Sequence, residues 1–92
     1  MSVVIIGGHE RMKNRYKEIC KKYKHKPKVF TKIKSGLSRQ IGCPDLVILF
    51  TATASHEMVR CAVEESERTN AILERSHTSS ANALIQILEM YV

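Results

Sequence analysis

The chain has 92 residues, of which 43% are hydrophobic and 26% are charged, and its formal net charge is +6. This length allows one compact domain spanning residues 1–92, and the hydrophobic fraction excludes a disordered chain. The longest apolar run is too short to cross a bilayer, and the first residues lack the layout of a secretory signal, so we expect a cytoplasmic protein without a membrane segment.

The first half of the chain predicts two strands and two helices. Residues 3–6 form an apolar run before a double glycine, which is typical of a strand buried on both faces. Apolar residues then recur at helical intervals and predict an amphipathic helix over residues 10–24. The segment "KPKVFTK" (26–32) predicts a second strand, and "SGLSRQIG" (35–42) predicts one or two helical turns that end at Gly42.

The second half repeats this alternation. The run "DLVILF" (45–50) predicts another fully buried strand, and Ser55 is placed to cap the helix that follows it. "NAILE" (70–74) predicts a fourth strand, followed by a final helix that reaches Tyr91. The helix after Ser55 is expected to expose three acidic side chains, Glu64, Glu65 and Glu67.

Alternating strands and helices over one domain predict an α/β fold with a parallel sheet and right-handed crossovers. The two fully apolar strands should be the central pair. We therefore expect a small three-layer domain, Rossmann-like or flavodoxin-like, with four parallel strands in the order 2-1-3-4.

Three of the four histidines follow strands of this expected sheet. His9 follows the first strand, His56 the third and His77 the fourth, whereas His25 lies elsewhere. In such a sheet, ligands bind beyond the carboxyl ends of the strands, so we expect these histidines to face one shared pocket. The same loops contain other candidate ligand-binding residues: Gly7, Gly8, Arg11, Ser55, Arg75, Ser76, Ser79 and Ser80.

Two kinds of ligand suit these residues. Hydroxyls, an arginine and free N–H groups at a helix N-terminus in "RSHTSS" favour an anion of the phosphate type, which histidine protonation would strengthen as the pH falls. Three neutral imidazoles, His9, His56 and His77, with Glu10 as a possible fourth ligand, could instead hold zinc or iron, and this binding would weaken as the pH falls. A third interpretation is that Ser55 and Ser79 cap helices and the histidines are ordinary loop residues.

Several common activities lack their signatures. The double glycine does not continue as Gly-x-Gly-x-x-Gly and no acidic residue ends the second strand, which argues against a dinucleotide site. No nucleophile elbow or zinc-protease helix is present, so we favour a ligand-binding or regulatory module over an enzyme. Cys20, Cys43 and Cys61 show no Cys-x-x-Cys spacing, which argues against disulfides and zinc ribbons.

The charge is unevenly distributed along the chain. Residues 1–42 carry 12 Lys or Arg and 2 Glu, whereas residues 43–92 carry 3 Arg and 7 acidic residues. The run "KKYKHKPK" (21–28) could bind nucleic acid, although it lacks the interleaved aromatic residues that stack on bases, and a solvated face is the preferred interpretation. The charge asymmetry and the weakly guarded "NAIL" edge strand also favour self-association, and we expect a homodimer.

Three short motifs extend the interpretation: "GGHERM" after the first strand, "SH" after the third and the closing "RSHTSS". With these motifs the chain resembles a family of small bacterial proteins catalogued as a domain of unknown function, and the resemblance covers nearly the whole chain. It implies a Rossmann-like fold and attaches no reaction to it. The matching positions are Gly7, Gly8, Ser55, His56, Arg75, Ser76 and Ser79.

Overall fold

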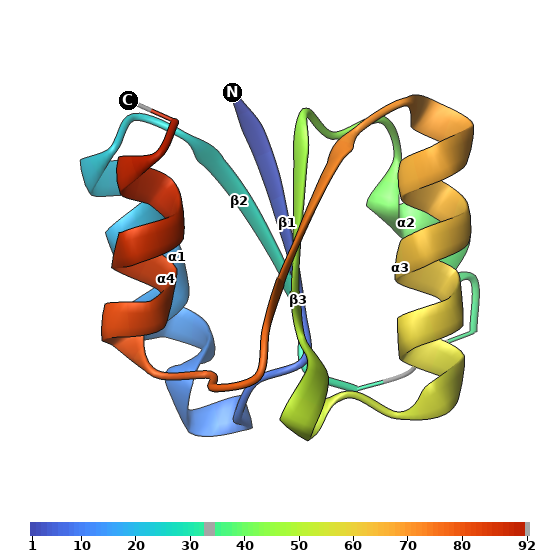
Figure 1. Cartoon of the computed structure of the whole chain (residues 1–92), viewed down its shortest axis with the longest axis horizontal. Helices are drawn as coiled ribbons and strands as arrows, with labels where there is room; N and C mark the ends of the chain where they lie inside the picture. Colours follow the sequence, from blue (N-terminus) through green and yellow to red (C-terminus); the bar gives the residue numbers. More distant parts are fainter. Residues whose placement is uncertain (33–34, 92) are drawn as a thin grey trace.

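The computed structural model describes residues 1–32 and 35–91, and it confirms the predicted α/β fold. Four parallel strands form one sheet in the order β2-β1-β3-β4, as expected (Figure 1). The strands are β1 (Ser2–Ile6), β2 (Lys26–Phe30), β3 (Leu46–Phe50) and β4 (Ile72–Ser76).

The two apolar strands occupy the centre of the sheet. β1 pairs with β2 on one side and with β3 on the other, with Val3 opposite Leu46. All five residues of β3 are buried, as are the last four of β1. A strand covered on both faces gains stability from apolar side chains at every position, which is why these runs do not alternate with polar residues.

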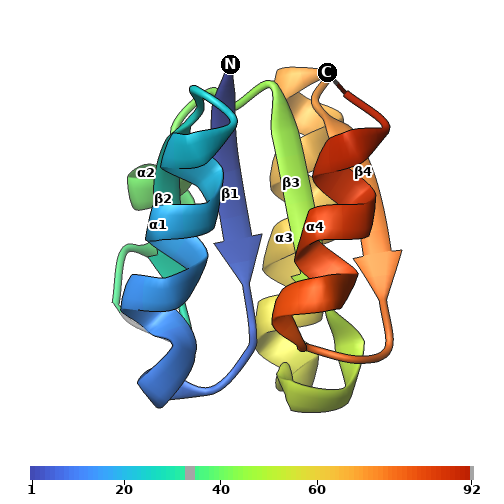
Figure 2. The same cartoon turned by 90° about the vertical axis from the view of Figure 1, so that its left-hand side faces the viewer.

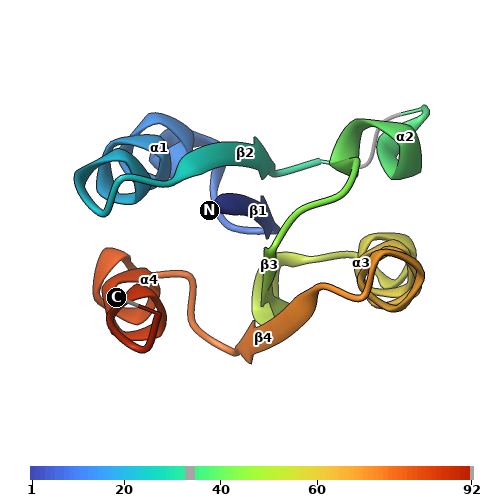
Figure 3. The ribbon, with the colours of Figure 1, turned by 90° about the horizontal axis from the view of Figure 1, so that it is seen from above.

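Helices cover both faces of the sheet. In Figures 2 and 3, α1 and α4 lie on one face, and α2 and α3 lie on the other. Val3 and Ile5 pack toward α1 and α4, whereas Val4 and Ile6 pack toward α2 and α3, because successive strand residues point to opposite faces. The helices are the short 3-10 turns η1 (Glu10–Met12) and η2 (Thr51–Thr53), and α1 (Lys13–Lys22), α2 (Leu37–Ile41), α3 (His56–Thr69) and α4 (Ala81–Glu89).

The structure corrects several boundaries. The predicted helix over 10–24 is divided into η1 and α1. β4 continues to Ser76 because its pairing with β3 extends to Phe50, so Arg75 belongs to the strand and not to the following loop. α4 ends before Tyr91, whose hydroxyl donates to Glu74 Oε1 at 2.5 Å.

One predicted solvent-facing side chain is buried. Glu65 of α3 is 8% exposed, and Arg68 Nη2 lies 2.7 Å from Glu65 Oε1. Arg68 is one helical turn away and supplies the opposite charge that a buried carboxylate needs. The prediction that Glu65 faces solvent was therefore wrong.

The cysteines differ in environment. Cys20 is buried in the core, and burial raises the pKa of its thiol to about 11, which keeps it protonated. Cys61 is partly buried against α2, and Cys43 is exposed before β3. Among the described residues, no helix combines the length and apolar character needed to cross a membrane.

Candidate functional site

The loops that follow β1, β3 and β4 all emerge on one edge of the sheet, the lower edge in Figures 1 and 2. Parallel strands require this, since every strand runs in the same direction. We call this region the carboxyl edge, and define it as residues 7–12, 51–57 and 75–82.

The double glycine of the carboxyl edge is required by packing. Gly7 and Gly8 both have positive φ values, +96° and +87°. A Cβ atom on Gly7 would lie 2.7 Å from the carbonyl oxygen of Phe50, and one on Gly8 would lie 2.6 Å from the ring of Tyr16. Gly8 N also donates to Thr53 Oγ1 at 2.6 Å, which fixes the β1 loop to the β3 loop.

Tyr16 links the β1 loop to the β4 loop. Its ring is fully buried against Phe50, with the ring centroids 5.4 Å apart. Its hydroxyl donates to the carbonyl oxygen of Ser79 at 2.6 Å and also has the backbone of His9 as a partner. Burial raises the pKa of this phenol, so it stays protonated as a donor. His9 and Ser79 are therefore held close to one another.

The β3 and β4 loops are joined by two further hydrogen bonds. Ala52 N donates to the carbonyl oxygen of His77 at 3.4 Å, and Thr51 Oγ1 donates to that of Ser76 at 3.5 Å. The three loops of the carboxyl edge thus form one connected frame.

Two helices begin at this edge with serine caps. Ser55 Oγ accepts from Met58 N at the start of α3, as predicted. The cap of α4 is Ser80, whose Oγ accepts from Ala83 N, and not Ser79. Ser79 precedes the helix because its carbonyl group is held by Tyr16.

The two helix N-termini differ in charge. The first turn of α3 contains Glu57, which already complements the positive end of the helix dipole. The first turn of α4 contains no acidic residue. An anion would therefore meet less competition at α4.

The structure divides the predicted residues between the two faces of the sheet. Ser79 and Ser80 precede α4, which lies on the same face of the sheet as α1. Tyr16 of α1 contacts Ser79 and the backbone of His9, and Arg11 lies two residues after His9 in η1. Arg75 pairs with Leu49, whose side chain packs toward α3, so the side chain of Arg75 starts on the same face of the sheet. On that face, Ser55 caps α3 and His56 is the first residue of the helix.

That the three histidine side chains share one pocket stays a prediction. His9, His56 and His77 are all exposed at the carboxyl edge. An open depression beside His9 is lined by residues 9–12 and includes neither of the other two histidines. Glu10, the possible fourth metal ligand, accepts a hydrogen bond from Thr31 Oγ1.

Residues 1–32 and 35–91 contain no group of three or more His, Cys, Asp or Glu side chains placed to hold a metal ion. Metal binding at His9, His56 and His77 remains a prediction without support from this geometry.

The basic run 21–28 passes from the end of α1 into the edge strand β2, with its five lysines exposed. Its one tyrosine, Tyr23, lies against the ring of His25 and donates to Glu89 Oε1 at 2.6 Å. That tyrosine is engaged and not presented for stacking on bases. Nucleic-acid binding by this run also remains a prediction.

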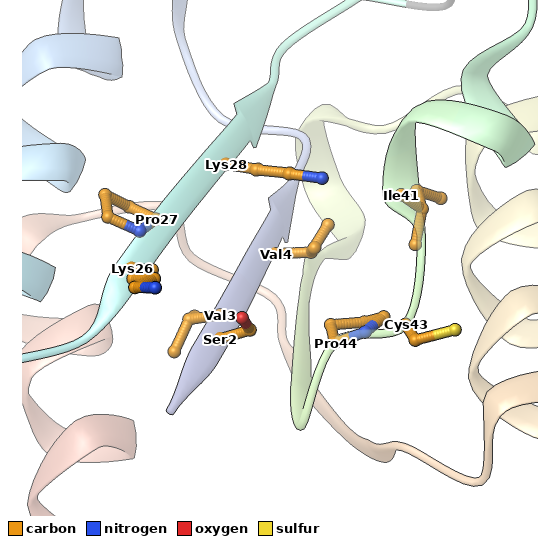
Figure 4. Close-up of a pocket in the computed structure, with 9 residues that line it drawn as sticks. All are labelled: Ser2, Val3, Val4, Lys26, Pro27, Lys28, Ile41, Cys43 and Pro44. Atoms are coloured by element: carbon orange, nitrogen blue, oxygen red, sulfur yellow. The ribbon is translucent and has the colours of Figure 1, made fainter.

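Sequence reasoning missed a cavity at the opposite edge of the sheet, shown in Figure 4. It lies beside the amino ends of β1 and β2 and is bordered by the segment between α2 and β3. The alternation of lysines in "KPKVF" was its one signal in the sequence, since Lys26 and Lys28 stand at positions that point to the face of α2. We call it the amino-edge cavity.

These features define a class of protein: a doubly wound, all-parallel α/β domain with a hydrogen-bonded frame of loops at the carboxyl edge. The chain belongs to the family described as "Uncharacterized protein conserved in bacteria (DUF2325)", whose model matches residues 2–91. This confirms the resemblance seen in the sequence. No curated protein and no solved structure matches the chain.

Proposed function

We propose that the protein is a small-ligand-binding or regulatory module that holds an anion of the phosphate or sulfate type at the start of α4. The observation that carries this proposal is the turn between β4 and α4, which Tyr16 fixes at Ser79 and which opens a capped helix without an acidic first turn. The first N–H groups of a helix lack intrahelical acceptors, and the dipole favours negative charge there.

Basic side chains near this turn support the proposal. His9 is brought to Ser79 by the Tyr16 hydroxyl, and the exposed Arg11 lies two residues further on. His77 stands in the turn itself. We expect an anion at the start of α4 to receive backbone N–H groups there and a guanidinium from Arg11.

The test is a two-dimensional ¹H–¹⁵N NMR titration with sodium sulfate, with sodium chloride at equal ionic strength as the reference. We expect amide shifts in residues 9–11 and 79–82, and about tenfold weaker binding for Arg11→Gln, since a charged hydrogen bond contributes about 1.5 kcal/mol.

Arg75→Gln is the matched control because it removes the same charge from the other face of the sheet. It should bind sulfate as the unmodified protein does. Equal losses for both variants, shifts centred on residues 55–57, or shifts that chloride reproduces would contradict a site at α4. Shifts centred on residues 21–28 would instead indicate a general anion-binding lysine run.

A further inference from the structure

The amino-edge cavity has a volume of about 160 Å³, room for about five water molecules. Its sheet wall comes from residues 2–4 of β1 and 26–28 of β2, in which Ser2 pairs with Lys26 and Val4 pairs with Lys28. The side chains of these pairs point to the face that α2 and α3 cover, as Ile6 and Phe30 do further along. The cavity exists because α2 has five residues and leaves the amino ends of these strands uncovered.

The opposite wall and the floor of the cavity are apolar. Val4 and Ile41 are each 1% exposed, and Pro44 is also buried. Figure 4 shows Val4, Ile41 and Pro44 around one space, with Lys28 extending from β2 across it. The sulfur of Cys43 points away from Lys28.

The polar group of the cavity is the ammonium of Lys28. Lys28 Nζ donates to the carbonyl oxygen of Gln40 at 3.1 Å, in the last turn of α2, where the helix dipole favours a cation. An ammonium has three N–H donors, so this bond positions the group and leaves donors for a ligand. Lys26 adds a second positive charge, and no carboxylate is among the described residues that line the cavity.

Lysines on an edge strand also protect a sheet against pairing with other chains. That role explains the charge of Lys26 and Lys28, but it does not explain why buried apolar side chains line the cavity beside the ammonium. A cation above an apolar floor matches a ligand with one negative group and a short hydrocarbon body.

We propose that the amino-edge cavity binds a short-chain monocarboxylate, with its carboxylate on Lys28 and its hydrocarbon chain against Val4, Ile41 and Pro44. This site is separate from the anion site at the carboxyl edge. It differs in preference as well, because an apolar floor disfavours sulfate and an open helix N-terminus provides no cover for a hydrocarbon chain.

The test is an NMR titration of the whole chain with sodium propionate and sodium valerate, which differ by two CH₂ groups. We expect amide shifts at residues 2–4, 28 and 41–43, and tighter binding of valerate by about fourfold for each added CH₂ group that is buried. Lys28→Gln should abolish the shifts, whereas Lys22→Gln, which removes the same charge from α1, should leave them unchanged.

Far-UV circular dichroism and urea unfolding will show whether Lys28→Gln keeps the fold. Lys28→Arg provides a second variant that keeps the charge, and it should retain part of the binding. Equal affinity for propionate and valerate, unchanged binding by Lys28→Gln in its folded state, or shifts confined to residues 9–11 and 79–82 would overturn the proposal. A negative result with propionate and valerate does not change the outcome of the sulfate titration, so the two proposals are tested independently.

Discussion

The ring of Tyr16 lies so close to Gly8 that no side chain fits at position 8. The missing Cβ of Gly8 lets the ring of Tyr16 lie against the backbone of the β1 loop. Tyr16 in turn reaches Ser79 with its hydroxyl. One glycine therefore positions a residue that connects the first and the last loop of the carboxyl edge.

Replacing Gly8 by alanine should reduce the free energy of unfolding by more than replacing Gly36. Both glycines have positive φ values, so both variants incur the cost of a left-handed backbone, about 1–2 kcal/mol. Only the Cβ at position 8 would collide with a buried ring, which adds about 1–3 kcal/mol, whereas nothing lies within 4 Å of the corresponding point at Gly36. Urea unfolding of the two variants measures the difference, and equal losses would show that Tyr16 moves aside freely.

At the scale of the elements, α4 depends on the residue that begins it. Ser80→Ala removes the acceptor for Ala83 N and should cost about 1 kcal/mol of unfolding free energy. Ser80→Asp supplies another acceptor and should restore most of the loss. Chemical denaturation of the three proteins tests this expectation, and a Ser80→Ala variant as stable as the unmodified chain would mean that another group caps the helix.

The strands could be predicted from the sequence because β1 and β3 are uninterrupted apolar runs. Only the centre of a parallel sheet buries such runs on both faces. The sheet order followed from that burial, without knowledge of any contact. The cap of α4 was assigned to the wrong serine because Ser79 and Ser80 are equally good caps by residue type. The choice between them depends on Tyr16, 63 residues away, and local patterns carry no such information.

The candidate sites, too, were only partly predictable from the sequence. The edge that gathers His9, His56 and His77 follows from topology, but the contact by which Tyr16 of α1 reaches the loop before α4 does not. The amino-edge cavity requires Lys28 of β2 to meet Ile41 and Pro44. In the sequence, Lys28 belongs to an ordinary basic run, and only its alternation with Lys26 on β2 distinguishes it.

Across the whole molecule, the two edges of the sheet are unequal. β2 carries Lys26, Pro27 and Lys28, which all oppose pairing with another strand. β4 has no proline, and Ile72 at its start is 47% exposed. If the expected homodimer forms, β4 is the edge where two copies meet, because lysines on both copies would repel at β2.

Light scattering over a range of protein concentrations tests this expectation. The unmodified protein should form a dimer, and Ile72→Lys should form a monomer because it places a charge on the pairing edge. Asn14→Lys adds the same charge on the exposed face of α1 and should leave the dimer intact. A monomer at all concentrations, or a dimer that persists in Ile72→Lys, would contradict pairing through β4.

The all-parallel order of the strands also governs how the chain can fold. Ser2 pairs with Lys26, 24 residues later, Leu46 pairs with Ile72, 26 residues later, and Val3 pairs with Leu46, 43 residues later. No strand can form a hairpin with its successor, so each pairing must close a long loop before it contributes stability, which slows folding relative to a helical bundle of the same length. β1 is the first strand to be synthesised, yet it gains its second neighbour only when the chain has reached β3. Until then β1 lacks one neighbouring strand, and of the four α-helices only α1 on one face and α2 on the other precede β3 and can cover it.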